Sequence, residues 1–428
     1  MRFRSLALTA ALLALPSVAH ANGRFPAANQ LAIAPANPSQ LLLRSTFGML
    51  LSSDGGQTWD WICEKGVGYG GTQDPSVGIA AGGTFIVGTF EGLRLSTDTG
   101  CSWSGMPGPL TENVVVDLVV RPDTPTVALL LTNKFSGSND AGALFASEVF
   151  ASSDDGKSWN TLGPPLDPTV LLQTLEVSAT DPRRIYASGA RGSGVTAKGT
   201  LLVSTTGGAS WIEREIPLDT TTETAPFICA VDPFNPDRLY VRTKGTAGSR
   251  LLVTDDAGKT FREVLKTTSD MLGFALSPDG QKAYAGTKDG LWIAKVATLS
   301  FSQNSHIAVQ CLKTSGTKLY ACSNELSGFA LGVSEDDGAT FAPLVHLYGI
   351  RGPLACSAES SQAQCVPDWP ALEESLGAPP DAGQAGGDAP PSGGGGCRCD
   401  TSHGSLGHAL GMATAALLVG LFFWRRRD

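Results

Sequence analysis

Two carboxylates interrupt otherwise apolar stretches of this 428-residue chain and are the side chains best placed for acid–base chemistry. Asp117 lies in VVVDLVV (Val114–Val120), and Glu176 lies in LLQTLEV (Leu171–Val177). Two carboxyl groups at a suitable separation can act as acid and nucleophile, or as acid and base, in glycoside cleavage. The sequence does not give that separation, and acids that only line a solvated opening are the alternative interpretation. We keep both as candidate catalytic residues while favouring a function without catalysis.

Other chemistry has little support in the sequence. There is no G-x-S-x-G elbow, phosphate-binding loop or dinucleotide fingerprint in a strand–turn–helix context. No C-x-x-C pair is present, and the histidines are not grouped at the spacing of metal ligands: His20, His306, His346, His403 and His408. We therefore expect neither a metal nor a cofactor.

The charge of the chain excludes nucleic acid as a partner. The formal net charge is −9, and removing the first 21 and last four residues lowers it to −13. An acidic body is repelled by phosphate backbones, and no stripe of Lys and Arg with interleaved aromatic residues compensates for this.

The N-terminus predicts export. Residues 1–21 combine two arginines, an apolar run from Leu6 to Leu15, and Ala19-His20-Ala21 as a cleavage site, which is typical of a signal peptide. The apolar run is about half of the roughly 20 residues that a membrane-spanning helix needs.

The C-terminus predicts a tether. Residues 378–396 are rich in Gly and Pro and should form a flexible linker. Residues 397–428 contain Cys397, Cys399, the apolar stretch Leu406–Trp424 and three terminal arginines. That stretch is long enough to span a bilayer, with the arginines on the cytoplasmic side. This order of parts resembles the C-terminal sorting tails of myxobacterial surface proteins, which implies a processed helix and retention through the Cys region. A permanent single-pass anchor is the alternative.

An octapeptide recurs six times through the middle of the chain. Each copy has a hydroxyl residue first, Gly fifth, Ser or Thr seventh and an aromatic residue eighth. The copies are SSDGGQTW (Ser52–Trp59), STDTGCSW (Ser96–Trp103), SSDDGKSW (Ser152–Trp159), STTGGASW (Ser204–Trp211), TDDAGKTF (Thr254–Phe261) and SEDDGATF (Ser334–Phe341). The third residue is Asp in five copies and Thr206 in the fourth.

These octapeptides resemble the Asp-box, or BNR, repeat of β-propellers such as sialidases, sortilin-type receptors, tandem-propeller glucanases and photosystem assembly factors. In such a turn Asp can accept backbone N–H groups, Gly can supply an unusual backbone angle, and the aromatic residue can start the next strand. The residues in these roles are Asp54, Gly56 and Trp59; Asp98, Gly100 and Trp103; Asp154, Gly156 and Trp159; Gly208 and Trp211; Asp256, Gly258 and Phe261; Asp336, Gly338 and Phe341. We interpret them as structural, not catalytic.

The spacing of the repeats predicts the architecture. Successive copies begin 44, 56, 52, 50 and 80 residues apart, and the last interval hides a degenerate unit at Met271–Lys295. The prediction is an all-β Asp-box β-propeller of seven blades, each a four-stranded antiparallel sheet, with six or eight blades as alternatives. We place it at residues 22–354, followed by an extension at 355–377. Expected inner strands are Val114–Val120, Leu171–Val177, Ile228–Val231 and Phe274–Leu276, and expected second strands are 185–187, 239–241, 283–285 and 319–321.

Cysteines in an exported chain are candidates for disulfides. Cys311 and Cys322 flank a hairpin turn and should lie opposite each other. Cys356 and Cys365 are expected to close a terminal loop, and Cys63 to meet Cys101 between neighbouring blades. Cys229 is left as a buried free thiol.

These patterns favour an exported, surface-tethered propeller that acts as a binding or scaffolding module for an extracellular protein or polysaccharide, and we expect a monomer. The loops at residues 134–142 and 190–199 are candidates for its exposed binding surface. One alternative is a sialidase-like or glucanase-like glycoside hydrolase, for which Arg24-Phe25-Pro26 superficially matches one sialidase element. The other is an envelope assembly factor.

Overall fold

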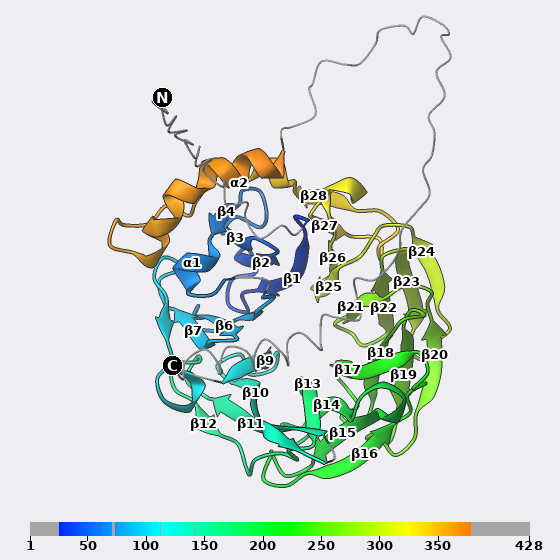
Figure 1. Cartoon of the computed structure of the whole chain (residues 1–428). Helices are drawn as coiled ribbons and strands as arrows, with labels where there is room; N and C mark the ends of the chain where they lie inside the picture. Colours follow the sequence, from blue (N-terminus) through cyan, green and yellow to red (C-terminus); the bar gives the residue numbers. More distant parts are fainter. Residues whose placement is uncertain (1–24, 71–72, 112, 141, 378–428) are drawn as a thin grey trace, which may run out of the picture.

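The described chain forms a ring of seven sheets arranged around one axis (Figure 1). The computed structural model describes residues 25–70, 73–111, 113–140 and 142–377. The predicted signal peptide, linker, Cys397–Cys399 motif and apolar C-terminal stretch all lie outside these residues. Each sheet has four antiparallel strands that are consecutive in the sequence, which confirms the predicted seven-bladed β-propeller and excludes a β-sandwich.

The strands of the first four blades have the following bounds. Blade 1 contains β1 (Ala28–Ile33), β2 (Leu41–Ser45), β3 (Gly48–Ser52) and β4 (Asp60–Ile62), and blade 2 contains β5 (Ser76–Ile79), β6 (Phe85–Thr89), β7 (Gly92–Ser96) and β8 (Ser104–Gly105). Blade 3 contains β9 (Val114–Val120), β10 (Ala128–Asn139), β11 (Gly142–Ser152) and β12 (Asn160–Thr161), and blade 4 contains β13 (Val170–Val177), β14 (Ile185–Arg191), β15 (Lys198–Ser204) and β16 (Ile212–Ile216).

The last three blades complete the ring. Blade 5 contains β17 (Glu223–Val231), β18 (Leu239–Gly245), β19 (Arg250–Thr254) and β20 (Arg262–Lys266), and blade 6 contains β21 (Met271–Leu276), β22 (Lys282–Thr287), β23 (Gly290–Lys295) and β24 (Ser302–Ser305). Blade 7 contains β25 (Cys311–Ser315), β26 (Lys318–Cys322), β27 (Leu331–Ser334) and β28 (Ala342–Val345). The degenerate unit is blade 6, and the predicted inner and second strands fall within the observed ones.

The hydrophobic core is divided among the interfaces between consecutive blades. Each of seven buried clusters draws on two neighbouring blades; between blades 3 and 4, for example, Leu129 and Leu131 pack with Leu172 and Leu175. Full burial of one such leucine stabilises the fold by about 1.5–3 kcal/mol. The ring is therefore held together chiefly by blade-to-blade packing.

The six octapeptides form equivalent turns between the third and fourth strands of their blades. In every copy the first hydroxyl accepts the N–H of the fifth-position glycine at 2.8–2.9 Å. The third residue accepts the N–H of the seventh at 2.8–3.0 Å. The glycines have φ between 77° and 95°, a left-handed region that favours glycine. Each aromatic residue immediately precedes the fourth strand, as predicted.

Threonine can replace the aspartate of this turn. In the fourth copy Oγ1 of Thr206 accepts the N–H of Ser210 at 2.9 Å, the bond that a carboxylate makes in the other five. The carboxylates also accept the seventh-position hydroxyl, and the bond from Ser158 to Asp154 lowers the pKa of Asp154 to about 2. The turns are thus built mainly from local hydrogen bonds.

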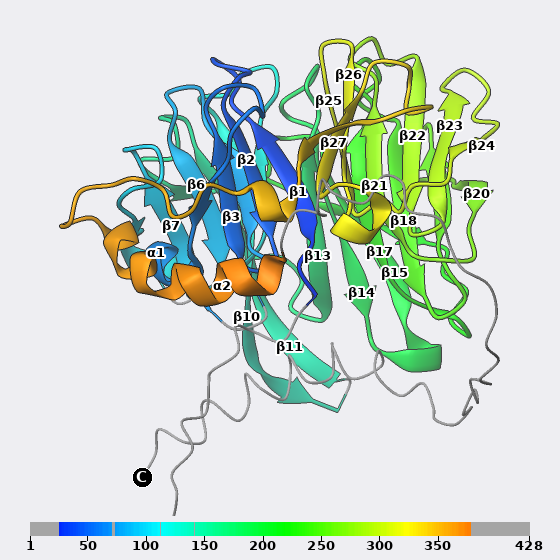
Figure 2. The ribbon, with the colours of Figure 1, turned by 90° about the horizontal axis from the view of Figure 1, so that it is seen from above.

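Ring closure does not use an exchanged strand. Blade 1 is made wholly from the N-terminal part of the described chain and blade 7 from its C-terminal part. Instead, the segment after β28, residues 346–377, crosses the outer side of blades 1 and 2 (Figure 2). We call this segment the strap. It contains short 3-10 helices at Leu347–Gly349 (η4) and Ser361–Asp368 (η5), and the helix α2 (Trp369–Leu376).

Two disulfides fasten the strap to the ring, and both pairings differ from the prediction. Cys365 is bonded to Cys63, next to the short helix α1 (Glu64–Val67), and Cys356 is bonded to Cys101. The predicted pairs Cys356–Cys365 and Cys63–Cys101 are therefore wrong. The strap spans two blades, so each of its cysteines meets a different one. The predicted Cys311–Cys322 pair is confirmed.

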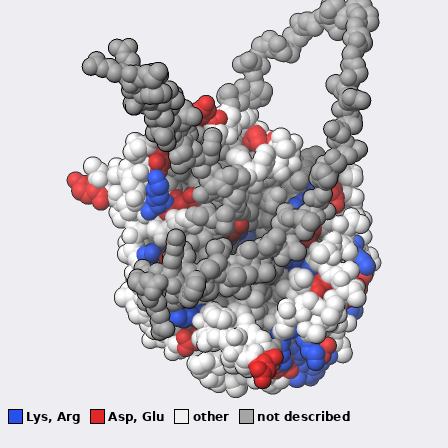
Figure 3. Space-filling model, in the orientation of Figure 1, with Lys and Arg blue, Asp and Glu red and all other residues white. Residues whose placement is uncertain are grey.

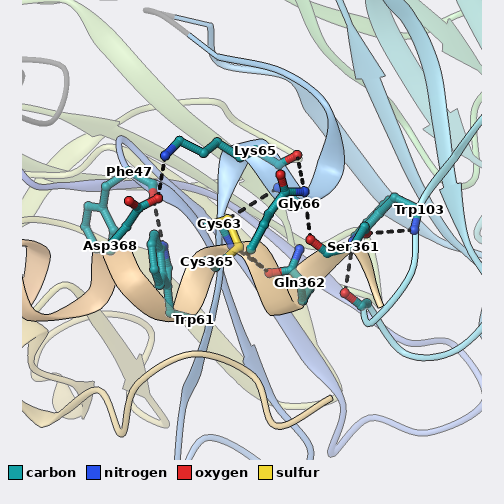
Figure 4. Close-up of a disulfide and its surroundings, with 12 residues drawn as sticks. Phe47, Trp61, Cys63, Lys65, Gly66, Trp103, Ser361, Gln362, Cys365 and Asp368 are labelled. Carbon is teal, nitrogen blue, oxygen red and sulfur yellow. Dashed lines mark hydrogen bonds and ion pairs between the residues drawn. A yellow bond between two sulfur atoms is a disulfide. The ribbon is translucent and has the colours of Figure 1, made fainter. Parts of the chain in front are cut away.

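Polar contacts secure the same junction (Figure 4). The side-chain Oε1 of buried Gln362 accepts the N–H of Cys63 at 3.1 Å, and Oγ of Ser361 accepts the N–H of Trp103 at 3.2 Å. Three disulfides are characteristic of a chain that folds in an oxidising compartment, so the protein is an exported one. Within the described ranges, no helix has the length and apolar character to cross a bilayer.

Candidate binding face

The ring has two unlike faces. Because the four strands of a blade alternate in direction, the turns between second and third strands all lie on one face, which we call the hairpin face. The octapeptide turns lie on the opposite face. In Figure 2 the long β10–β11 hairpin projects beyond the other blades on the hairpin face, at the bottom of the view.

Exposed apolar side chains gather on the hairpin face. Five consecutive blades (7, 1, 2, 3 and 4) each present one there, and we call this set the apolar arc. Its members and their exposed fractions are Leu326 (85%), Phe25 (57%), Phe90 (55%), Phe135 (42%) and Val195 (77%). Phe25 precedes β1 and is held at the β2–β3 turn, where Thr46 Oγ1 donates to its carbonyl. The apolar arc is therefore a series of separate exposed apolar side chains, one per blade, on the same face of the ring.

On blade 3 the member of the apolar arc, Phe135, lies on the long β10–β11 hairpin. Residues 134–142, expected as an exposed loop, are paired strand as far as Asn139 and Gly142, with a bulge between Phe135 and Gly137. The rings of Phe135 and Phe145 meet edge-on at 6.3 Å across the two strands. The insertion is thus an ordered projection with an aromatic pair near its base, since the strands stay paired beyond these rings to Asn139 and Gly142.

A cavity of about 410 Å³ lies on blade 4, the next blade of the ring. Of the predicted loop at residues 190–199, both ends are paired strand, and the loop itself contains the turn Gly194–Thr196 (η2). Residues 195–199 form one wall of the cavity, and the end of β16 with the residues after it forms the other. Ala197 and Ile216 are buried in its lining, and Lys198 and Glu215 are exposed on it. Neither charged side chain has a hydrogen bond or ion pair with the described residues. The cavity combines aliphatic walls with two free charges.

Arg191 braces the wall of this cavity. Its guanidinium pairs with Asp167 at 2.8 Å and with Glu213 at 2.9 Å, and Nε donates to Thr169. The hydrogen bond to Glu213 raises the pKa of Arg191 further above its ordinary range. Charged side chains are visible over β15 and β16 in the lower part of Figure 3. This network ties β14 to β16 and fixes the rim.

Asp117, one of the two candidate catalytic acids, joins two blades. Its Oδ2 accepts the N–H of Leu175 on blade 4 at 2.8 Å, and its Oδ1 accepts the N–H of Leu118. Thr174 does the same on the next interface, where its Oγ1 accepts the N–H of Ile228 at 3.0 Å. Burial raises the pKa of Asp117 to about 6, and the two backbone hydrogen bonds oppose that rise. The carboxylate is engaged in holding inner strands together.

Glu176, the other candidate, has no hydrogen bond or ion pair with the described residues. It lies on β13 opposite Tyr186 of β14. Lys313 holds the equivalent position in blade 7, on β25 opposite Tyr320 of β26. Burial and the charge of Asp117 raise the pKa of Glu176 to about 8, while the charge of Lys313 opposes that rise. The inner strands thus bring Asp117, Glu176 and Lys313 into electrostatic contact, but only Glu176 is an unengaged acid.

The remaining candidates add little chemistry. Cys229 is a free thiol, as predicted, but it is half-buried and not fully buried; its partial burial raises its pKa to about 11, which disfavours the reactive thiolate. Over the described ranges, no three His, Cys, Asp or Glu side chains gather so as to hold a metal ion. Arg24 lies outside those ranges. The apolar arc and the blade-4 cavity were not predictable as a unit, because their parts are spread over five blades.

Comparison with known proteins supports the fold alone. No protein-family model matches the chain, and no curated protein matches it. The structure is similar to that of an ancestral GH74 enzyme, with a TM-score of 0.52, 15% identity, and coverage of 75% of this chain and 45% of the enzyme. It is also similar to a puromycin-hydrolyzing peptidase of Mycobacterium tuberculosis, with a TM-score of 0.51, 12% identity, and coverage of 74% and 53%. The chain therefore spans about half the length of these proteins. It is a seven-bladed β-propeller.

Proposed function

We propose that this propeller is an exported binding module that holds an extracellular partner on its hairpin face. One observation carries the proposal: five of the eight large apolar side chains exposed in the described residues lie on that face, one on each of five consecutive blades. A rigid ring that presents such side chains together offers a broad, pre-organised surface. The octapeptides are Asp-box repeats that shape the opposite face, and the C-terminal tail is a sorting signal that tethers a monomer to the cell surface.

Substitutions on the two faces test this function. The double variant F90S/L326S removes two members of the apolar arc, and Phe234→Ser removes an exposed phenylalanine (64%) from the opposite face. We expect cross-linking on intact cells to recover one stoichiometric protein or polysaccharide partner with the native protein and with Phe234→Ser, but not with F90S/L326S. Equal loss in both variants, or no loss in either, would contradict the proposal.

Glycoside hydrolysis is the second candidate, favoured by Glu176. A carboxyl group whose pKa is about 8 is protonated at neutral pH, as a general acid must be. A second free carboxylate is needed for the known two-acid mechanisms, and Asp117 is engaged by two backbone N–H groups. A panel of β-glucans and sialosides would decide between the two functions. Turnover that Glu176→Gln abolishes would replace the binding proposal with this one.

A further inference from the structure

We propose that the outer edge of β16, together with the cavity beside it, binds an extended peptide segment of the partner by strand addition. This inference rests on the proposed function and specifies the partner as a protein. Strand addition couples main-chain hydrogen bonds at a sheet edge to pockets for alternate side chains.

The edge of β16 is open. It is the last strand of its sheet, and no described strand pairs with its outer side. It has five residues, as the outer strand β20 also has, whereas the outer strands β8 and β12 have two each. The larger cavity distinguishes β16 from β20. Ile212, at its beginning, is 48% exposed. A strand of this length presents unpaired backbone donors and acceptors to another extended segment.

The molecule already adds an extended segment to an equivalent edge. On blade 1 the strap runs parallel to the outer strand β4, with Trp61 bridged to Pro353. Trp61 donates its N–H to the carbonyl of Gly352 at 2.7 Å and accepts the N–H of Leu354 at 2.8 Å. The outer strands of this ring are therefore geometrically able to pair with a fifth strand.

The chemistry of the cavity fits a peptide better than a sugar. Its apolar lining is aliphatic, from Val195, Ala197, Ile216 and Leu218, and contains no aromatic ring on which a pyranose could stack. Its volume of about 410 Å³ lies within the range of small-ligand pockets and accommodates a branched aliphatic side chain with its neighbours. The matching hollow beside β20 is only about 70 Å³ and is lined by the paired Glu223 and Arg250.

The free carboxylate of the cavity, that of Glu215, selects the flanking residue. Glu215 lies on β16, beside the open edge, and no described cation pairs with it. A lysine two positions from the aliphatic residue lies on the same side of an extended peptide and can reach this carboxylate. The preferred segment therefore has an aliphatic residue followed, two positions later, by a basic one.

A defined peptide library tests the site. Fluorescein-labelled, N-acetylated octapeptides rich in Thr would carry Ile, Val, Leu, Phe or Ser at the centre and Lys, Gln or Glu two positions later. Fluorescence anisotropy with the full-length protein should show at least ten-fold tighter binding of the Ile/Lys peptide than of the Ser/Glu peptide. Thr220→Trp, which fills the cavity, should weaken that binding at least ten-fold, and Glu215→Lys should transfer the preference to the Glu peptide.

Two matched controls should leave binding unchanged. Ala247→Trp places the same bulk in the hollow beside β20, and Glu359→Lys makes the same charge change on the exposed strap. Equal affinity across the library, or equal losses in the controls, would overturn the peptide site. If the library fails while F90S/L326S still releases the cellular partner, the peptide site is wrong and the proposed function stands. Cello-oligosaccharide binding that Thr220→Trp abolishes would assign the cavity to a sugar instead.

Discussion

The Sγ atoms of Cys63 and Cys365 are bonded across a sequence separation of 302 residues, and this bond fixes the strap to blade 1. Together with the Cys101–Cys356 bond, which spans 255 residues, it links the C-terminal segment to the first two blades of the ring. A strand exchanged between the first and last blades would make a comparable link. A cross-link stabilises mainly by restricting the unfolded chain, and the effect grows with the length of the closed loop. The strap disulfides should therefore dominate covalent stabilisation.

Removing both strap disulfides should lower the free energy of unfolding more than removing the hairpin disulfide. Chain-entropy arguments give about 6 kcal/mol for a loop of the Cys63–Cys365 separation and about 3 kcal/mol for the 11-residue Cys311–Cys322 separation. Urea unfolding of the variant with Ala at Cys63, Cys101, Cys356 and Cys365 would be compared with C311A/C322A. A larger loss in C311A/C322A would show that the strap does not close the ring.

Asp117 should be replaceable by threonine but not by valine. Thr174 makes the same inter-blade bond with a hydroxyl, so Asp117→Thr keeps an acceptor for the N–H of Leu175. Valine has nearly the same shape as threonine but no hydrogen-bond acceptor. Asp117→Val therefore leaves the buried N–H of Leu175 unpaired, which costs about 1–3 kcal/mol. Urea midpoints of the two variants measure the difference. Equal stability of the two would contradict an inter-blade role for Asp117.

Features that depend on neighbouring residues were predictable from the sequence. The octapeptide turns are held by bonds within eight residues, so their composition and spacing indicated six blades of one kind and an interval wide enough for a seventh, degenerate one. The Cys311–Cys322 pair followed from hairpin register, which is also local. The strap disulfides were not predictable, because they depend on how the segment after β28 folds back over the ring.

The candidate site was predictable only in parts. The sequence marked residues 134–142 and 190–199 as insertions, but it gave no sign that Phe90 and Leu326 share their face. That grouping depends on which turns of different blades point the same way. Glu176 and Asp117 were recognised as acids on inner strands, but the backbone N–H of Leu175 that engages Asp117 belongs to another blade. Tertiary contacts, not residue types, separate the structural acid from the free one.

Restoring aspartate in the fourth octapeptide should stabilise the protein. Thr206→Asp would add a charged acceptor for Ser210, as Asp154 does for Ser158, and consensus changes of this kind commonly contribute about 0.5–2 kcal/mol. The pKa of Asp154 is lowered to about 2, so the gain should be full above pH 4 and lost as the pH falls towards 2. Urea midpoints at pH 7 and pH 2.5 test this. If Thr206→Asn stabilised the protein as much as Thr206→Asp does, the added charge would not be the cause of the stabilisation.

Glu176 should make the protein less stable as the pH rises from about 4.5 to about 8. Its pKa in the folded protein is raised from the ordinary value of 4.5 to about 8, so across this range the native state holds a proton that the unfolded state has released. Each increase of one pH unit then lowers the free energy of unfolding, and Glu176→Gln should abolish this pH dependence. Replacing Lys313 by Met takes away the charge that opposes the rise, so the pKa of Glu176 should increase further. Carbon-13 NMR of the Glu176 carboxyl in the native protein and in Lys313→Met measures both values directly. A carboxyl that titrates near 4.5 would show that Glu176 is solvated, and it would also remove the one observation in favour of glycoside hydrolysis.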